Sequence, residues 1–447
     1  MKFKPKSPIL LIIGLMFCCS FFSNQCVAQT DTIKVMAYNV LGFGPGNCQG
    51  AMPPLYGYLK TIISYAKPDI AGLDKMQCVK TSNTDLQGIS PASFPDTVIA
   101  ECFDTNFSFC PFTDISGCQD GASNIIFYNH AKIGYVSTTP LYTGQEDIEL
   151  YKLYYKDPNL TKTNDTTFLY VISCHTISGA VSAQRDVQDT IIINALKKMF
   201  NHTPNLILMG DFNTRTTTEP GYELITQTAD TNFILNDPPF HPDAHLTYPC
   251  DWDATPTLCP KDLTTTTRIT TLPNSCGTTG GGKDWYDHIF ISPWLVNGVD
   301  YMNYIKNSYT TLGNDGNRIG VAINAGTNTS APSNVINALF NFSDKYPVMV
   351  SLAVTDHVLA INNILADPGC IRINNPIENN LVIHFANYLY GQSMTMSIYD
   401  VCGRNLYQST FNVDVSDLSK NIPLTPGVYF VRFESGQSVT TLKVVKE

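Results

Sequence analysis

A short apolar segment that ends in polar residues constrains the fold of this chain more than any other feature. Residues 206–209 are all apolar and lie between more polar neighbours, a pattern that predicts a buried strand. Gly210, Asp211, Phe212 and Asn213 follow directly. Because Asp211 and Asn213 lie two residues apart, an extended chain directs their side chains to the same side. The two residues could close a strand-end turn, or they could hold a divalent cation, a water molecule or a phosphoryl oxygen.

Polar residues recur at the ends of other predicted strands, which favours a ligand site over a simple turn. The strand predicted for residues 32–40 contains Asn39 near its end, and the strand predicted for residues 167–175 ends at His175. Ligands of α/β proteins bind beyond such strand ends. Further strands are predicted at 70–73, 124–128, 284–291 and 342–350, helices at 55–66 and 183–200, and loops at 81–121 and in the Thr-rich run 264–271.

The two ends of the chain carry separate signals. Three lysines precede an apolar run from Ile9 to Phe22, and the small residue Ala28 follows it, so we expect a cleaved signal peptide. No later apolar run is long enough for a transmembrane segment. From about Gly369 onward, short strands of alternating polarity predict a small all-β sandwich. The expected organisation is a signal peptide (1–28), an α/β domain (29–355), a linker (356–368) and a β domain (369–447).

The charge and the cysteine content limit the classes of ligand and the cellular environment that suit this chain. The formal net charge is −10, and loss of the three leader lysines would make it −13. We therefore expect no broad attraction to nucleic acid or to anionic membranes, although a local basic site stays open. Eleven cysteines lie beyond residue 28. Oxidising conditions outside the cytoplasm favour disulfides, and two local groups are predicted, one of Cys102, Cys110 and Cys118, the other of Cys250, Cys259 and Cys276.

Six motifs in order resemble the endonuclease/exonuclease/phosphatase superfamily, which includes pancreatic-type deoxyribonuclease, neutral sphingomyelinase and inositol-phosphate phosphatases. They are Tyr38-Asn39-Val40, Pro68-Asp69-Ile70-Ala71-Gly72-Leu73, Ser173-Cys174-His175, Gly210-Asp211-Phe212-Asn213, Asp287-His288-Ile289-Phe290 and Ser343-Asp344-Lys345-Tyr346-Pro347-Val348. The resemblance covers roughly residues 32 to 352. It implies an α/β fold, namely a two-sheet α/β sandwich of the deoxyribonuclease-like type ahead of the small all-β sandwich. It also implies phosphodiester hydrolysis assisted by Mg²⁺ or Mn²⁺.

The resemblance implies a role for each matched residue. Asn39 and Asp211 would help to position the metal and the attacking water. Asn213 would bind a phosphate oxygen, and His175 would contact the phosphate or the leaving group. Asp287 would support the site.

The chain departs from the family pattern at two positions of the reaction centre. Asp74 and Lys75 stand where members carry a metal-binding glutamate, and Lys345 stands where they carry the histidine that Asp344 would orient. A protonated lysine cannot bind Mg²⁺, and its reference pKa of about 10.4 makes it a poor base at neutral pH. His357 follows the last predicted strand and lies too far along the chain to replace Lys345 easily.

Three interpretations follow from these substitutions. The leading one is an active phosphoesterase in which Asp74 becomes a metal ligand, which needs a bulge in its strand, while Lys345 loses its proton or acts as an electrostatic clamp. The second is an inactive pseudoenzyme whose lysines replace the metal's charge and bind a phosphorylated ligand. In the third, the matched residues are structural. Substrates of this superfamily range from nucleic acids to lipids and inositol phosphates, so the substrate stays open.

The C-terminal domain shows a second resemblance. Asn375-Pro376, the turn at 398–404, the segment 426–431 and the terminal 443–446 look like the sorting domain of type IX secretion substrates in Bacteroidetes-type bacteria. An adhesive or carbohydrate-binding β module is the alternative. The resemblance implies the type IX secretion machinery as a partner. It also implies export across both membranes to the cell surface or the medium.

Overall fold

The computed structural model describes residues 30–77, 94–113, 122–144, 147–271, 276–357, 365, 369–436 and 438–447. The chain divides into two compact units, and the boundary lies between His357 and Val358. This boundary falls within the segment expected to be a linker. Most of that segment, like the expected signal peptide, lies outside the described residues.

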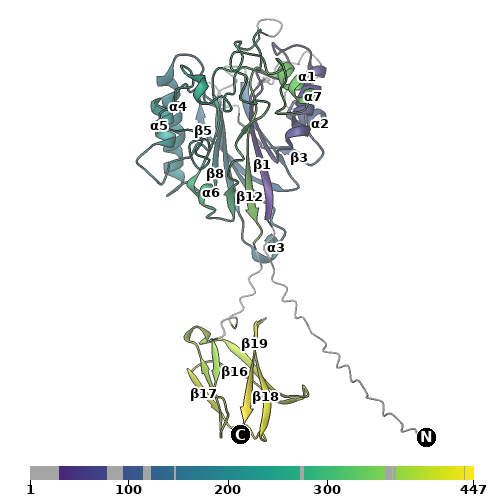
Figure 1. The fold of residues 1–447 in the computed structure, drawn as a ribbon, viewed down its shortest axis with the longest axis vertical. Coiled ribbons are helices and arrows are strands. Elements are labelled where there is room, and N and C mark those ends of the chain that lie inside the picture. The colour runs from purple at the N-terminus through teal and green to yellow at the C-terminus, as the bar shows by residue number, and fades with distance from the viewer. Residues whose placement is uncertain are drawn as a thin grey trace, which may run out of the picture. The chain divides into compact units, whose positions relative to one another are not determined.

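Two sheets form the centre of the first unit (Figure 1). One sheet has the order β10-β12-β1-β2-β4-β3, with β11 beside β12, and the other has the order β5-β6-β7-β8-β9. The strands of the first sheet are β1 (Thr30–Asn39), β2 (Ile70–Gln77), β3 (Phe107–Phe109), β4 (Ala122–Asn129), β10 (Met302–Tyr304), β11 (Thr310–Thr311) and β12 (Val348–Thr355). Those of the second are β5 (Ile133–Thr143), β6 (Asp147–Tyr155), β7 (Phe168–His175), β8 (Leu206–Asp211) and β9 (Asp287–Ile291).

Helices cover the outer faces of both sheets, which makes a layered α/β sandwich (Figure 1). The helices α1, α2 and α7 lie on the side of the first sheet, and α4 and α5 lie on the side of the second. Their bounds are α1 (Met52–Ala66), α2 (Phe94–Cys102), α3 (Leu160–Thr163), α4 (Ser182–Met199), α5 (Pro220–Thr226), α6 (Pro293–Asn297) and α7 (Ser333–Phe342), with a short 3₁₀ turn at η2 (Pro256–Leu258). The two-sheet fold expected from the sequence is confirmed.

The sequence pattern accounts for these layers. Ile33, Val35 and Ala37 alternate along β1 and join apolar residues of β7 and β8 in one buried cluster between the sheets. Met36 and Tyr38 point the other way and join α1 and α7 in a second cluster. A strand that is buried on both faces has a continuous apolar run in its sequence. Every residue of β8 is buried, so residues 206–209 give the clearest strand pattern in the chain.

Three expectations about local structure are corrected. The last strand of the unit begins at Val348, because Pro347 has no N–H and the residues before it bond to β1 and to the Thr-rich run instead. The segment expected to be loop-rich contains α2 and β3 in its described part. The first part of the Thr-rich run is not solvated, since Thr264, Thr265, Thr266 and Thr267 are all buried, whereas residues 269–271 are exposed as expected.

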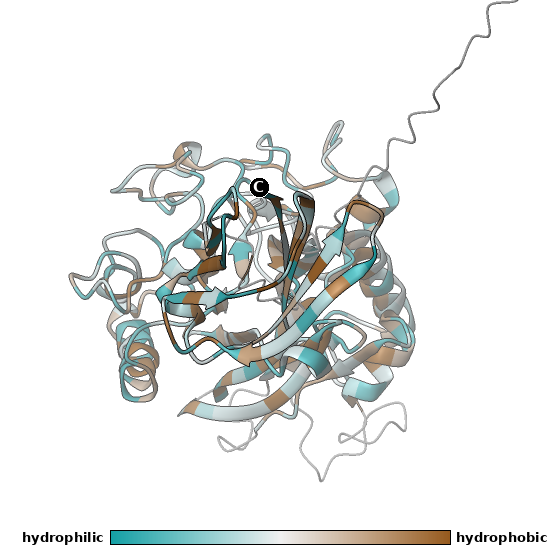
Figure 2. Cartoon of the chain, turned by 90° about the horizontal axis from the view of Figure 1, so that it is seen from below, coloured by the Kyte–Doolittle hydropathy of each residue, from teal (hydrophilic) through white to brown (hydrophobic). Residues whose placement is uncertain are grey.

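The second unit is a sandwich of two small antiparallel sheets, as the sequence predicted. Their orders are β13-β14-β17 and β16-β15-β18-β19. Alternating exposed and half-buried residues along β16 show how the strands keep one face toward the apolar core, and in Figure 2 apolar and polar bands follow one another along the strands. The strands are β13 (Ile371–Ile373), β14 (Leu381–Phe385), β15 (Ser393–Asp400), β16 (Asn405–Asn412), β17 (Asp417–Lys420), β18 (Gly427–Ser435) and β19 (Ser438–Lys446), with a 3₁₀ turn at η4 (Asn387–Leu389).

Within the described ranges, none of the helices combines the length and the apolar character that a bilayer crossing needs.

Candidate functional site

Strand register brings the predicted site residues to one edge of the sandwich. In the first sheet Asn39 of β1 lies beside Asp74 of β2. In the second sheet His175 of β7 lies beside Asp211 of β8, which in turn faces Asp287 of β9. The two groups come from different sheets, so the site forms where the sheet edges meet.

The backbone after β8 is shaped by two residues with positive φ. Gly210 has a φ of 138°, and a Cβ there would lie 1.8 Å from the carbonyl oxygen of Cys174. Only glycine fits, which explains its place in the motif. Asn213 has a φ of 49°, a conformation that asparagine tolerates better than most residues. Its N–H donates to Asp211 Oδ1 at 3.0 Å, and its Nδ2 donates to the carbonyl of Thr176 at 2.9 Å.

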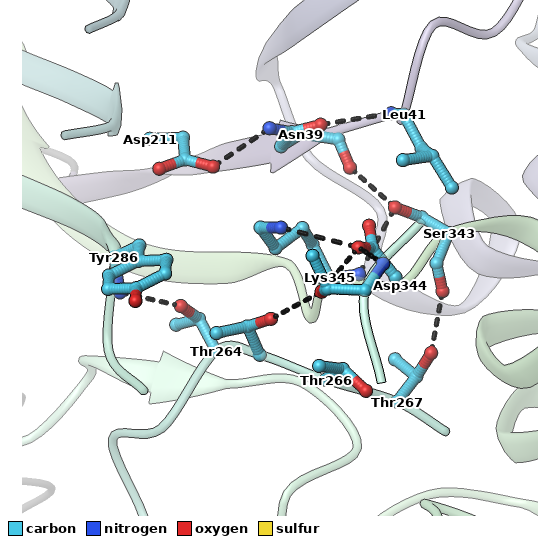
Figure 3. Close-up of polar contacts among 12 residues, drawn as sticks. Asn39, Leu41, Asp211, Thr264, Thr266, Thr267, Tyr286, Ser343, Asp344 and Lys345 are labelled. Atoms are coloured by element: carbon cyan, nitrogen blue, oxygen red, sulfur yellow. Dashed lines mark hydrogen bonds and ion pairs between the residues drawn. The ribbon is translucent and has the colours of Figure 1, made fainter. Parts of the chain in front are cut away.

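A hydrogen bond joins the two sheets at the centre of the site. Asn39 Nδ2 donates to Asp211 Oδ2 at 2.8 Å, and both side chains are buried (Figure 3). The amide oxygen of Asn39 accepts from the N–H of Leu41 at 2.9 Å. The amide group therefore presents its nitrogen, not its oxygen, to the carboxylate.

The pairing of β2 with β4 is irregular between Leu73 and Met76, which is the bulge that the Asp74 alternative requires. Lys75 sits at this irregularity with a φ of 57° and lines the cleft. Its N–H donates to Asn124 Oδ1 at 3.2 Å, which helps to hold this uncommon conformation. Asp74 is fully buried instead, and its Oδ1 accepts from Ser173 Oγ at 2.6 Å. The bulge therefore places the lysine, and not the aspartate, in the cleft wall.

Lys345 and Asp344 form a buried ion pair at the bottom of the site (Figure 3). The Nζ of Lys345 lies 3.5 Å from Asp344 Oδ2, and the two side chains are 9% and 1% exposed. Burial opposes the charge of Lys345, yet neighbouring carboxylates raise its pKa above the ordinary value. Asp344 contributes most to this rise, followed by Asp211 and Asp287. Lys345 is therefore a cation, and of the two roles considered for it the electrostatic clamp is favoured.

The partners of Asp344 keep it ionised. Burial raises its pKa, but the charge of Lys345 and two hydrogen bonds from Thr278 outweigh this and lower the pKa below its usual value. The N–H and the hydroxyl of Thr278 each lie 2.7 Å from Asp344 Oδ2. Asp287 behaves in the opposite way, since burial and the charge of Asp211 raise its pKa well above the usual value.

The Thr-rich run supports the site from below (Figure 3). The hydroxyl of Thr264 accepts from the N–H groups of Tyr286 and Asp287, at 3.0 and 3.1 Å. The N–H of Thr267 donates to the carbonyl of Asp344 at 3.0 Å. Threonine is common here because a small hydroxyl satisfies buried backbone groups without adding charge.

A cleft of about 740 Å³ opens over these residues. Six residues that the sequence motifs singled out line it, namely Asn39, His175, Asp211, Asn213, Asp344 and Lys345. Asp74 and Asp287 lie behind its wall and are absent from the described lining. Sequence reasoning missed Arg215, Thr278 and Tyr286, which also line the cleft. Arg215 lies two residues beyond Asn213, and this proximity was the one signal that could have revealed it.

The residues present do not fit a divalent cation. The Asn39 amide offers a nitrogen to Asp211, and the ammonium group of Lys345 already supplies positive charge to the carboxylates. The Asp74 carboxylate bonds to Ser173 away from the cleft. Across the described ranges, no group of three or more His, Cys, Asp and Glu side chains is arranged to hold a metal.

His357 lies outside the cleft lining. Its Nε2 is 2.7 Å from the Thr167 hydroxyl, its Nδ1 is 3.0 Å from Asp165, and its ring stacks on Tyr301. These contacts satisfy both ring nitrogens, which agrees with the expectation that this histidine does not replace Lys345.

One disulfide differs from the expected local pairing. Cys276 bonds to Cys48, 228 residues away in sequence, and both cysteines line the cleft. Cys250 and Cys259 are buried thiols, as are Cys102 and Cys110, while Cys118 lies outside the described residues. Local spacing misled the prediction, because the fold brings the Gly-rich loop after β1 against the loop that carries Thr278.

Comparison with known proteins adds the following findings. Residues 374–447 match the family model of the secretion system C-terminal sorting domain. A search of the curated proteins finds no match. Similar solved structures include the catalytic domain of human Nocturnin with bound sulfate, at 15% identity over 73% of this chain and 97% of that chain, with a TM-score of 0.43. An endonuclease/exonuclease/phosphatase family protein from Bacteroides thetaiotaomicron has 15% identity over 73% and 99%, with a TM-score of 0.42. A mannosyl-6-phosphatase from the same species has 15% identity over 72% and 99%, with a TM-score of 0.40.

The chain therefore carries a secretion system C-terminal sorting domain, and its structural neighbours include endonuclease/exonuclease/phosphatase proteins.

Proposed function

We propose that this exported protein binds a phosphorylated ligand in the cleft, with lysine side chains in place of a divalent metal. The observation that carries the proposal is the position of Lys345, whose ammonium group lies 3.5 Å from Asp344 and compensates the charge of Asp211. Lysine binds phosphate as a point charge, so a lysine-based site needs no metal for affinity.

The charge of the cleft supports an anionic ligand. Lys75, Arg215 and Lys345 contribute three positive charges to the described lining, against two negative charges from Asp211 and Asp344. This local excess stands out in a chain of net charge −10. The carboxamide of Asn213 and the ring of His175 add polar groups on the same wall. The acidic remainder of the chain disfavours long nucleic acids, which need an extended basic surface.

The same geometry disfavours hydrolysis by the natural sequence. Water that attacks phosphorus must lose a proton, and the group at the position of the usual base is the protonated Lys345. Asp344 is already held by Thr278 and by the lysine. The alternative, a metal-dependent phosphoesterase that recruits Asp74, needs a bulge in β2, but the bulge that is present turns Lys75 and not Asp74 to the cleft.

We further propose that the protein leaves the cell through the type IX secretion machinery. The match of residues 374–447 to the sorting domain supports this route. The proposed organisation remains a signal peptide over 1–28, the cleft-bearing domain over 29–355, a linker over 356–368 and the sorting domain over 369–447. Export to the cell surface or the medium would follow, and the eventual ligand would be extracellular.

The test compares binding and turnover with and without metal. Hydrolysis of an activated phosphodiester and of plasmid DNA is measured with Mg²⁺, Mn²⁺ or chelator, and phosphate-ester binding is measured by calorimetry in the same buffers. We expect binding that chelator does not change, with no turnover. The double variant Lys75→Glu with Lys345→His is expected to gain metal-dependent turnover.

Two results would contradict the proposal. Chelator-sensitive turnover by the natural sequence that disappears in Asp211→Ala would establish the active enzyme instead. No binding of any phosphate ester, combined with an Asp211→Ala variant that changes only stability, would mean that the matched residues are structural.

A further inference from the structure

Arg215 of the cleft lacks the close carboxylate partner that the structure gives to Arg185 and Arg318. Within the described residues the guanidinium of Arg215 has one ion pair, with Asp253, in which 3.9 Å separate NH1 and Oδ2 and the two side chains are 35% and 42% exposed. Such a long, exposed ion pair contributes little to the stability of the fold. The guanidinium of Arg215 makes no hydrogen bond within the described ranges, whereas its backbone N–H donates to Glu219 Oε1 at 3.0 Å. The loop is thus held while the charged group is left available.

Two other arginines of the same unit have structural roles, and their contacts differ from those of Arg215. Arg185 is almost fully buried and forms a two-pronged pair with Glu219 at 2.9 to 3.1 Å. Arg318 bonds to Asp315 at 2.8 and 3.0 Å and to several backbone carbonyls. Arg215 has no such contacts, so fold stability does not explain it.

The position of Arg215 places it beside the proposed phosphate site. It follows Asn213 by two residues and lines the cleft with Tyr286, whose carbonyl accepts from the N–H of Phe212 at 2.8 Å. Lys75 reaches the same cleft from the other sheet. The cleft therefore has cations on both walls as well as Lys345 at its base.

We propose that Arg215 forms a second anion subsite, so that the cleft selects small ligands with two separate anionic groups over ligands with one. This inference rests on the proposed function, in which the first phosphate lies near Lys345 and Asn213. A guanidinium binds phosphate through two parallel hydrogen bonds, which suits an exposed arginine whose one carboxylate contact within the described residues is long. A volume of about 740 Å³ matches a small-molecule site, and the bisphosphate of a sugar or polyol has the required chemistry.

Calorimetric titration of the purified full chain at fixed ionic strength tests the subsite. The probes are fructose 6-phosphate and fructose 1,6-bisphosphate. The variant is Arg215→Met, and the control is Lys283→Met, which removes a cation that lies near the cleft but does not line it. We expect the bisphosphate to bind roughly 10-fold more tightly than the monophosphate, because one charge-assisted hydrogen bond contributes on this scale. Arg215→Met should abolish this preference by weakening the binding of the bisphosphate far more than that of the monophosphate, and the control should keep the preference.

The outcomes separate the two proposals. Equal affinity for both probes, or a preference that survives in Arg215→Met, would overturn the second subsite while the proposed function stands. Loss of the preference in Lys283→Met to the same extent would reduce the effect to general electrostatics and would also overturn the subsite. Binding of neither probe would overturn the subsite and the proposed function together.

Discussion

Replacement of Lys345 by methionine should destabilise the first unit strongly, because the lysine is the buried counter-ion of the site. Its Nζ lies 3.5 Å from Asp344, and the two side chains are only 9% and 1% exposed. Methionine keeps most of the apolar stem but removes the charge. Asp344 would then be buried with the hydrogen bonds of Thr278 as its main compensation, and Asp211 would lose a neighbouring cation.

The expected loss in the free energy of unfolding follows from the burial of the ion pair between Asp344 and Lys345. Removal of one partner of a buried ion pair costs about 3–5 kcal/mol, since the other charge stays uncompensated. In a domain of this size each kcal/mol lowers Tm by roughly 2 °C, so a decrease of roughly 6–10 °C is expected. The double variant Asp344→Asn with Lys345→Met should recover much of the loss, because it removes both charges.

The chain offers a matched control for this variant. Lys283 and Asp284 are also adjacent in sequence, and Lys283 Nζ lies 3.7 Å from Asp284 Oδ2, but Lys283 is 45% exposed. Lys283→Met should cost clearly less than Lys345→Met, because water screens the exposed lysine, although Asp284 is only 7% exposed. Chemical denaturation and calorimetry of all three variants give the free energies of unfolding. A loss for Lys345→Met no larger than that for Lys283→Met would refute the view that Lys345 is a buried counter-ion.

Three further predictions use other parts of the structure. Burial and the charge of Asp186 raise the pKa of Asp189 to about 8, so the folded state holds a proton that the unfolded state releases near its ordinary value of 3.8. Stability should therefore fall as pH rises from about 4 to 8, and Asp189→Asn should flatten this fall in Tm measured across that range. Gly210→Ala should prevent soluble expression or lower Tm sharply, because its Cβ would meet the carbonyl of the preceding strand at 1.8 Å; a normal melting curve would contradict the backbone geometry. Cys48→Ser should lower the free energy of unfolding by about 2–5 kcal/mol, since the disulfide to Cys276 closes a very long loop, and the reduced natural chain should melt at the same temperature as the variant.

The apolar runs and the alternating side chains of the strands made much of the fold predictable from the sequence. The apolar run before Asp211, the strand that ends at His175 and the strand that contains Asn39 all lie where periodicity placed them. The carboxyl ends of such strands meet at one edge, so the gathering of these residues could also be anticipated. The small sandwich of the second unit was readable for the same reason, since side chains of a strand alternate with a period of two.

The residues that end the strands could be read from the sequence alone, and its motifs drew attention to Lys75 and Lys345. The surroundings of these lysines depend on contacts between distant parts of the chain. A local irregularity in β2 turned Lys75 into the cleft and left Asp74 behind it, and such a bulge has no signal in the local pattern. The raised pKa of Lys345 depends on the carboxylates that surround it. The disulfide between Cys48 and Cys276 joins two loops that are far apart in the chain. These features arise from contacts through space, and local periodicity does not record them.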